Sequence, residues 1–161
     1  MFVQVFDRIF DRNVTSETMK QKHERIFRDY GIKIWENVID YGQKEWPPLR
    51  LEIHGRSIQN LFGLSCSIYL VDNKYLIIND STPFKNVHAY DVEGNWLWDI
   101  EPCNYKDGKP VNFFYGICEA ITDESGRRQL IVGNFPVTYR TDLATGKGTT
   151  IWKIEDDTDS R

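Results

Sequence analysis

The chain has 161 residues, of which 40% are hydrophobic and 27% are charged, so it is long and apolar enough to fold as one domain, and wholesale disorder is not expected. Twenty Lys and Arg stand against 24 Asp and Glu, a net charge of -4, which argues against a generic nucleic-acid binder because such proteins need a basic surplus. No apolar run approaches the roughly 18 residues of a transmembrane helix, and the charged residues near the start do not fit a secretory signal.

The first element that the sequence predicts is a helix over residues 16–30. Thr15 or Ser16 can accept a hydrogen bond from an amide at its start, and Gly31 suits the left-handed conformation that ends many helices. One stripe of this helix carries the apolar side chains, namely Met19, Ile26, Phe27 and Tyr30. This stripe predicts the face of the helix that packs against the rest of the protein.

The sequence pattern does not decide the secondary structure of the rest of the N-terminal third. Residues 2–10 fit a helix or a strand, and residues 32–41 are equally open. Trp46-Pro47-Pro48 is a rigid break, because each proline fixes its own φ and restrains the residue before it. We therefore place the junction between two parts of the chain there. The prediction is a single domain, 1–161, made of a mixed helical part, 1–48, a β-rich part, 49–154, and an acidic tail, 155–161.

From Leu49 onward the pattern predicts about eight short strands. Leu51 and Ile53 alternate with polar neighbours, and turn-forming residues then separate apolar runs at hairpin spacing. The predicted hairpins are 67–71 with 75–78, 87–91 with 95–100, 114–122 with 129–132, and 137–141 with 149–154. We therefore expect an α+β protein in which the N-terminal helical segment packs on one mainly antiparallel sheet of about eight strands with hairpin repeats.

Two stretches of the β-rich part are similar to each other. Leu76-Ile77-Ile78-Asn79 corresponds to Leu130-Ile131-Val132-Gly133, and further along Trp98 corresponds to Trp152. Each copy reads as a buried strand, a second strand ending in Asp, a turn with Gly and a third strand reaching Trp. Over about residues 67–156 this pattern resembles quinoprotein-type β-propeller repeats, most closely in DLATGKGTTIW. The resemblance implies a strand order and a structural role for the two tryptophans, but two copies are too few to close a propeller.

The sequence shows no motif for catalysis, for a metal or for a cofactor. His23, His54 and His88 lie far apart, and we interpret the last two as structural residues within strands. Gly146-Lys147-Gly148-Thr149 lacks the spacing of a phosphate loop. The cysteines, which contain no CxxC pair, are Cys66, Cys103 and Cys118. We therefore expect no enzyme, no cofactor, no metal site, and a cytoplasmic protein with reduced thiols.

The strongest functional lead is an acidic hairpin. Residues 86–105 contain four acidic side chains and no Lys or Arg, and they surround Trp96-Leu97-Trp98. Aromatic side chains dominate the hot spots of protein interfaces. We interpret Trp98 as a core residue. The predicted partner-binding residues are Asp91, Glu93, Trp96, Asp99 and Glu101.

These observations favour a non-catalytic protein-binding protein. Its sharpest form is a bacterial immunity protein that neutralises a co-encoded toxin, such as a nuclease with a basic cleft, because complementary charge speeds the encounter. The expected partner is thus a protein, with neither nucleic acid nor a membrane involved. A second hypothesis is a small-ligand-binding or regulatory β-rich domain that acts as a homo-oligomer through its sheet edges. A third is an enzyme with a carboxylate pair in a pocket, for which loss of an activity in Asp91→Asn or Glu119→Gln would be the test.

Overall fold

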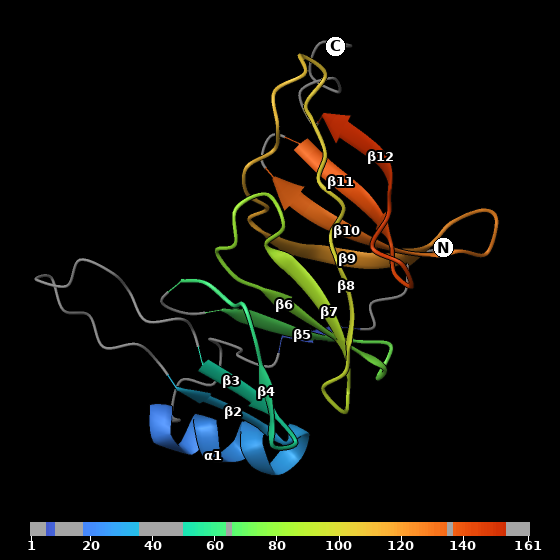
Figure 1. Cartoon of the computed structure of the whole chain (residues 1–161). Coiled ribbons are helices and arrows are strands. Elements are labelled where there is room, and N and C mark those ends of the chain that lie inside the picture. The colour runs from blue at the N-terminus through green and yellow to red at the C-terminus, as the bar shows by residue number, and fades with distance from the viewer. Residues whose placement is uncertain (1–5, 9–17, 36–49, 64–65, 135–136, 154–161) are drawn as a thin grey trace, which may run out of the picture.

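The computed structural model of the chain describes residues 6–8, 18–35, 50–63, 66–134 and 137–153. These residues contain one helix and twelve strands, and the strands form three antiparallel sheets (Figure 1). The N-terminal elements are β1 (Phe6–Arg8), α1 (Met19–Tyr30), β2 (Ile32–Trp35), β3 (Arg50–Ile53) and β4 (Arg56–Ile58). The later strands are β5 (Ser67–Val71), β6 (Tyr75–Asn79), β7 (Val87–Asp91), β8 (Trp96–Asp99), β9 (Gly116–Thr122), β10 (Arg128–Asn134), β11 (Val137–Asp142) and β12 (Gly148–Lys153).

The strands belong to three sheets, so the prediction of one sheet of about eight strands is wrong. The orders are β1-β5-β6-β7-β8, β12-β11-β10-β9 and β2-β3-β4. Hydrophobic alternation shows which residues form strands and which face they bury, but it does not show where one sheet ends and the next begins. The antiparallel hairpins are confirmed, and one helix with antiparallel sheets is compatible with the α+β class.

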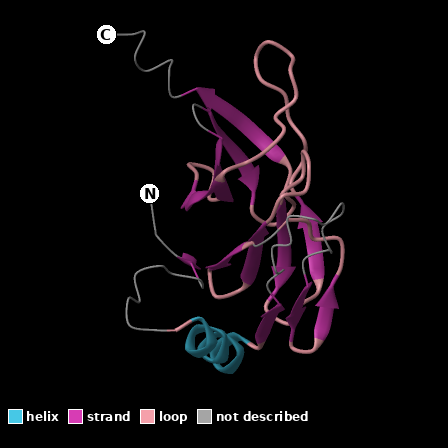
Figure 2. Cartoon of the chain, turned by 90° about the vertical axis from the view of Figure 1, so that its left-hand side faces the viewer, coloured by secondary structure: helices cyan, strands magenta, loops and turns pink. Residues whose placement is uncertain are grey.

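The five-stranded sheet is the central layer of the molecule. The four-stranded sheet covers one of its faces, and the three-stranded sheet with α1 lies on the other side (Figures 1 and 2). Alternate residues of the central strands therefore enter two different cores, with Ile77 and Ala89 in one and Leu76 and Tyr90 in the other. A strand that is buried on both faces reads as a continuous apolar run, which is what β6 shows.

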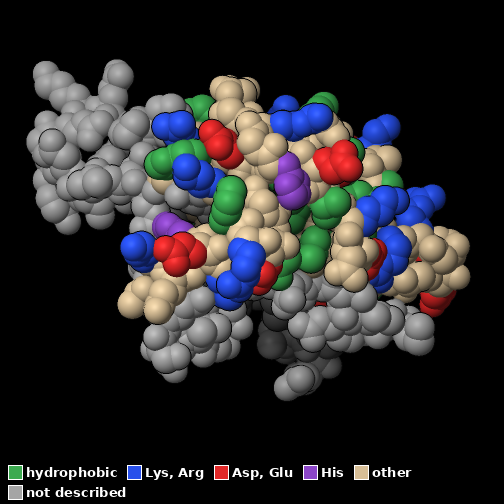
Figure 3. Space-filling model, turned by 90° about the horizontal axis from the view of Figure 1, so that it is seen from below, with side chains coloured by type: hydrophobic (Ala, Val, Ile, Leu, Met, Phe, Trp, Pro, Cys, Tyr) green, Lys and Arg blue, Asp and Glu red, His purple; other side chains and the backbone are tan. Residues whose placement is uncertain are grey.

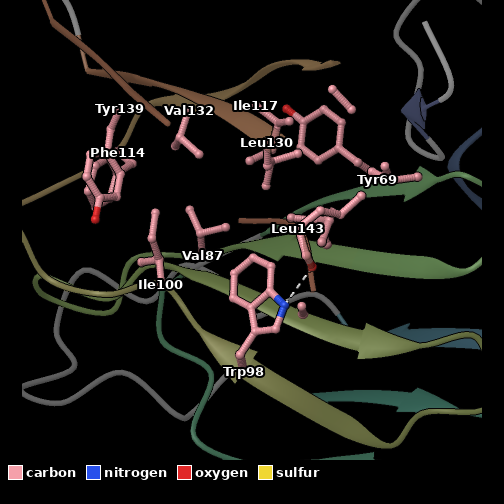
Figure 4. Packing of buried hydrophobic residues seen from close by; sticks show 14 of the residues in the cluster. Tyr69, Val87, Trp98, Ile100, Phe114, Ile117, Leu130, Val132, Tyr139 and Leu143 are labelled. Carbon is pink, nitrogen blue, oxygen red and sulfur yellow. Dashed lines mark hydrogen bonds between the residues drawn. The ribbon is translucent and has the colours of Figure 1, made fainter. Parts of the chain in front are cut away.

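Trp98 of β8 joins the central sheet to the four-stranded sheet. Its side chain is only 4% exposed, and its indole Nε1 donates a hydrogen bond to the carbonyl oxygen of Leu143 at 2.9 Å (Figure 4). The ring also lies against Gly146, in the turn between β11 and β12, where an added Cβ would come within 2.4 Å of it. The interpretation of Trp98 as a core residue is therefore confirmed.

The two similar stretches of sequence fall on corresponding strands of two sheets. Their aligned segments lie in β6 and β7 of the central sheet and in β10 and β11 of the four-stranded sheet. The third strand of each copy, β8 or β12, pairs with the second in both cases. The resemblance to quinoprotein-type propeller repeats stays a prediction.

The helix α1 begins later than the sequence predicts and ends where expected. Its N-cap is Thr18, whose hydroxyl accepts from Gln21 N at 3.2 Å while the Gln21 side chain accepts from Thr18 N at 3.0 Å. Gly31 ends it with φ 69, as predicted. Ile26 is buried, but Phe27 is 56% exposed, so its place on the buried stripe is wrong. Only a narrow strip of the helix contacts the small sheet. Successive residues point about 100° apart around a helix, so Phe27 points away from this strip although Ile26 lies on it.

Several N-terminal predictions receive a definite outcome. The open segments 2–10 and 32–41 contain β1 and β2, which are both strands. His54 is not a strand residue as expected, because His54 (φ 48) and Gly55 (φ 79) form the two-residue turn between β3 and β4. The Trp46-Pro47-Pro48 junction and the tail 155–161 lie outside the described residues. No helix in the described part of the chain is long and apolar enough to cross a membrane.

Candidate functional site

A pocket of about 540 Å³ opens beside the central sheet. One wall is formed by β7 and β8, through His88, Tyr90, Trp96 and Asp99. The opposite wall is formed by the end of β4 and the segment after it, residues 57–62, together with side chains from the loop between β6 and β7. Its volume lies within the roughly 300–1,000 Å³ range of pockets that receive small molecules or single side chains.

His88 lies in the wall of this pocket between two carboxylates. Its Nδ1 is 2.7 Å from Asp99 Oδ1, and its Nε2 is 2.9 Å from Asp80 Oδ1. Asp99 faces His88 because the two residues are paired across β7 and β8. Asp80 follows β6 directly and is 3% exposed, whereas the side chain of Asp99 is 37% exposed. The arrangement therefore joins a buried carboxylate, a buried imidazole and a carboxylate at the pocket surface.

The charges of this group stabilise one another. Burial alone would lower the pKa of His88, but the hydrogen bonds to Asp80 and Asp99 and the charges of both carboxylates outweigh burial and raise that pKa to about 9. Burial acts to raise the pKa of Asp99, and the hydrogen bonds from His88 and Trp96, with the charges of His88 and Lys85, hold it below its usual range. At neutral pH His88 is therefore an imidazolium and Asp99 a carboxylate.

This geometry does not suit His88 to proton transfer. A catalytic histidine needs one ring nitrogen directed at the substrate while the other is oriented by a partner. Here both ring nitrogens of His88 contact carboxylates. The group is therefore a rigid charged support for the pocket wall, in agreement with the structural role that the sequence predicts for His88.

Asp80 was not singled out from the sequence, although it organises the pocket. Its carboxylate accepts hydrogen bonds from Thr82 N at 3.0 Å, from Thr82 Oγ1 at 2.7 Å and from Phe62 N at 3.0 Å. These bonds tie the segment after β4 to the loop after β6. The sequence signal for the bond to Thr82 N is Asp80 itself, because an Asp side chain often accepts a hydrogen bond from the backbone amide two residues later. The bond to Phe62 has no sequence signal.

Asn86 anchors the other end of the same loop. The residue is fully buried, and its Nδ2 donates to Phe114 O at 2.7 Å while its Oδ1 accepts from Phe114 N at 2.9 Å. The amide of Asp80 donates to the carbonyl of Asn86 at 3.0 Å. Residues 80–86 are therefore held at both ends, so the side chains that they present to the pocket are positioned by buried hydrogen bonds.

Large aromatic side chains are exposed at the pocket and on one of the loops that form it. Phe62 and Trp96 line the pocket and are 50% and 60% exposed, and Phe84, 41% exposed, belongs to the same loop as the pocket-lining residues Thr82 and Lys85. Trp96 is also oriented, because its Nε1 donates to Asp99 Oδ1 at 3.0 Å. We call Phe62, Phe84 and Trp96 the aromatic rim.

Phe84 has a backbone conformation that favours glycine. Its φ is 65, in the turn that follows Pro83. Left-handed backbone costs a residue with a Cβ roughly 1–2 kcal/mol, and a bulky residue in it is an outlier. The chain therefore holds an exposed phenyl ring in a strained turn.

The five predicted partner-binding residues lie in three places. Trp96 and Asp99 line the pocket. Asp91 shapes the turn after β7, where its carboxylate accepts from Glu93 N at 3.0 Å and from Asn95 N at 2.9 Å. Burial acts to raise the pKa of Asp91, and the hydrogen bonds from Asn95 and Glu93 lower it. The side chain of Glu93 is exposed in the same turn.

The fifth residue, Glu101, is separate from the pocket. It follows β8, its side chain is exposed, and its backbone N–H donates to Gly146 O at 3.0 Å, on the side of the four-stranded sheet. The pocket therefore brings together two of the five predicted residues. Whether any of the five contacts a partner stays a prediction.

The face seen from below carries side chains of several kinds. Lys and Arg, Asp and Glu, and hydrophobic side chains are interspersed over it (Figure 3). Phe27 is an exposed aromatic of α1 and does not line the pocket. It therefore offers a matched control for the aromatic rim.

Searches of protein-family models, of curated proteins and of solved structures find no significant match to the chain. Within the described residues, no group of three or more His, Cys, Asp or Glu side chains is arranged to hold a metal ion. Of the described cysteines, Cys66 and Cys103 are free thiols, and burial, with the charges of Asp80 and Glu101 respectively, raises their pKa values to about 12 and about 11. Such thiols are protonated and poor nucleophiles at neutral pH.

Proposed function

We propose that the protein is a non-catalytic, cytoplasmic protein-binding protein, and that its specific role is that of a bacterial immunity protein neutralising a co-encoded toxin, with a nuclease as the favoured class. The observation that carries the proposal is the aromatic rim, in which Phe62 and Trp96 line one pocket and are 50% and 60% exposed, and Phe84, on the loop that contributes Thr82 and Lys85 to the pocket, is 41% exposed. Exposed apolar side chains gathered in one region mark interaction sites, and aromatic residues dominate the energy of protein interfaces.

The strain at Phe84 supports the same proposal. A glycine at this position would remove the cost of the left-handed backbone, whereas phenylalanine keeps that cost and leaves its side chain 41% exposed. Strained backbone that persists at an exposed position is a reason to look for function there. Contact between the Phe84 ring and a partner would offset the free-energy cost of the strained turn.

The chemistry of the pocket supports a binding role over catalysis. The imidazole of His88 has both ring nitrogens engaged by carboxylates. An immunity protein needs a rigid surface rather than a reactive group, because a preorganised surface loses less conformational entropy when it binds. The acidic side chains of Glu93, Asp99 and Glu101 on or next to the β7–β8 hairpin suit a partner with a basic cleft.

The experiment is a binding assay with the product of the adjacent gene. The purified protein should capture that product and suppress its toxicity in cells. Trp96→Ala should weaken the complex by at least about 30-fold, which corresponds to the roughly 2 kcal/mol that defines a hot spot. Phe27→Ala removes an equally exposed aromatic from α1 and should change the affinity by less than about threefold. A non-toxic neighbour that does not bind refutes the immunity role.

A second candidate function has its own support. A pocket of about 540 Å³ is large enough for a small ligand, so a ligand-binding or regulatory domain that acts as a homo-oligomer is the alternative. Screening metabolites by thermal shift and measuring the mass by light scattering test it together. A ligand that raises the melting temperature of an oligomer favours this function, and a strict monomer with no ligand contradicts it.

A further inference from the structure

We propose that the pocket receives the guanidinium group of an arginine side chain from the protein partner, held between the face of the Trp96 ring and the carboxylate of Asp99. This inference rests on the proposed protein-binding function and specifies its chemistry. It makes Asp99 and Trp96 a paired recognition element, and it predicts that a neutral or anionic group is rejected.

One oxygen of the Asp99 carboxylate is available to a ligand. Both hydrogen bonds to its carboxylate, from His88 Nδ1 at 2.7 Å and from Trp96 Nε1 at 3.0 Å, go to Oδ1. Within the described residues Oδ2 accepts no hydrogen bond, and the side chain is 37% exposed on the pocket wall. A charged oxygen with free lone pairs at the surface of a pocket is a site for a cationic N–H donor.

The indole ring of Trp96 is held in one orientation beside this carboxylate. Its indole N–H is bound to Asp99, so the edge of the ring is directed at the same carboxylate while the ring remains 60% exposed. A guanidinium group stacks flat on an aromatic ring and donates its hydrogen bonds outward within its own plane. An arginine stacked on Trp96 would therefore direct N–H groups toward the edge at which Asp99 lies. A lysine ammonium has no such plane.

Three charged side chains line the pocket. They are the Asp99 carboxylate, the His88 imidazolium and the Lys85 ammonium. The imidazolium of His88 is already matched by the two carboxylates, and both its nitrogens are engaged, so an anion would find only Lys85 as a charged partner and would be repelled by Asp99. Lys85 is exposed and has a flexible stem, so its ammonium can turn toward water when a second cation enters.

The remaining walls fit the rest of an arginine side chain. Ile58, Phe62 and Tyr90 supply apolar surface for the aliphatic stem. Ser57 and Gln59 supply neutral side-chain oxygens that can accept hydrogen bonds from the guanidinium N–H groups that Asp99 does not bind. The pocket thus combines an apolar lining with a small number of polar groups, which is the usual composition of a specific binding site.

The experiment follows the indole N–H signal of Trp96 by NMR, assigned through its loss in Trp96→Phe. The probes are N-acetyl-arginine methylamide and its citrulline counterpart, which has nearly the same shape but no charge. The arginine probe should shift the signal saturably with a Kd on the order of 1–10 mM, as expected for a single side chain. The citrulline probe and inorganic phosphate should leave the signal unchanged.

Variants separate the contributions of the charges. Asp99→Asn keeps an acceptor for Trp96 but removes the charge, and it should weaken the arginine probe at least tenfold, whereas Glu101→Gln, an exposed acid outside the pocket, should have no effect. Lys85→Met, at an exposed position where folding is not at risk, should tighten the arginine probe about two- to fivefold because a like charge is removed. An anion site would instead be abolished by Lys85→Met.

The outcomes distinguish this inference from the proposed function. Equal shifts with arginine and citrulline, a shift with phosphate, or no shift up to about 50 mM probe overturn the arginine pocket, and capture of the toxin can still succeed in that case. If the arginine probe binds as described but the neighbouring gene product is neither toxic nor bound, the immunity role fails while the pocket stands.

Discussion

Replacing Gly146 by alanine tests the contact that joins the central sheet to the four-stranded sheet. Gly146 has φ 72, and left-handed backbone costs an alanine roughly 1 kcal/mol. The new Cβ would lie 2.4 Å from Cε3 and 2.6 Å from Cδ2 of Trp98. The ring is 4% exposed and bonded to Leu143 O, so it cannot move aside freely. Overpacking adds roughly 1–3 kcal/mol, which gives a total of about 2–4 kcal/mol.

Gly126→Ala is the matched control. Gly126 has φ 83, also in the left-handed region, but nothing lies within 4 Å of an added Cβ. Its substitution should therefore cost only the backbone contribution, about 1 kcal/mol. The difference between the two glycines measures the contact with Trp98 without the conformational cost that they share.

Urea unfolding of both variants measures these free energies, and an unchanged dependence on denaturant validates the comparison. The excess cost of Gly146→Ala should disappear when Trp98→Ala is introduced into the same chain, because a double-mutant cycle isolates the interaction between two residues in contact. Equal losses at Gly146 and Gly126, or an excess that persists without the Trp98 ring, would refute the packing described here.

Three further predictions follow from the geometry. Phe84→Gly should weaken partner binding, and in urea it should cost less than the roughly 3–5 kcal/mol typical of removing a buried Phe side chain, because the left-handed strain is relieved; a loss in that full range would contradict the strain at this turn. The pKa of His88 is raised from 6.5 to about 9, so the charged imidazolium contributes fully to stability below about pH 6.5, and this contribution is lost as the pH rises through about 9. Urea titrations across this window should show the loss of stability, and His88→Gln should abolish this pH dependence. Arg128→Lys should cost about 1 kcal/mol in thermal unfolding, because Nε and Nη2 of Arg128 bind Asp72 in a bidentate pair at 3.0 and 2.7 Å, whereas Arg127→Lys, an exposed residue, should be neutral.

Local structure in the β-rich part was predictable from sequence because local chemistry determines it. The strands 67–71 and 87–91 are confirmed with the predicted limits, and Asp72-Asn73-Lys74 forms the expected turn, with positive φ at Asp72 and Asn73. The helix limit at Gly31 is confirmed for the same reason, since a single residue favours the left-handed conformation. Such features depend on neighbours in the chain.

The division between the central and the four-stranded sheet was not predictable in the same way. It depends on the segment between β8 and β9, which leaves the central sheet and carries Val111 and Phe114 into the core between these two sheets. Nothing in its sequence states that the next strand will pair with β10 alone. Strand pairing between distant segments is decided by how whole faces pack, and alternation does not encode it.

The candidate site was predicted in part. The acidic and aromatic neighbourhood of Trp96 and Asp99 predicts a binding role for both, and both line the pocket. The same neighbourhood predicts this role for Asp91, but the Asp91 carboxylate is occupied by backbone amides of its own turn. No sequence pattern points to the pairing of Asp80 with Phe62, because their hydrogen bond joins residues 18 positions apart. Composition can suggest a surface, but only the fold shows which of its residues are already used.

The position of β1 at one edge of the central sheet has a consequence for folding. The strands β5, β6, β7 and β8 pair in chain order through two short turns and the loop 80–86, so this meander can form from contacts that are close in sequence. β1 pairs with β5 across the whole N-terminal part of the chain, with Phe6 opposite Val71, and this closure has a much larger entropic cost. Backbone amides of β6 and β7 should therefore exchange with solvent most slowly, and β1 should join last and open first.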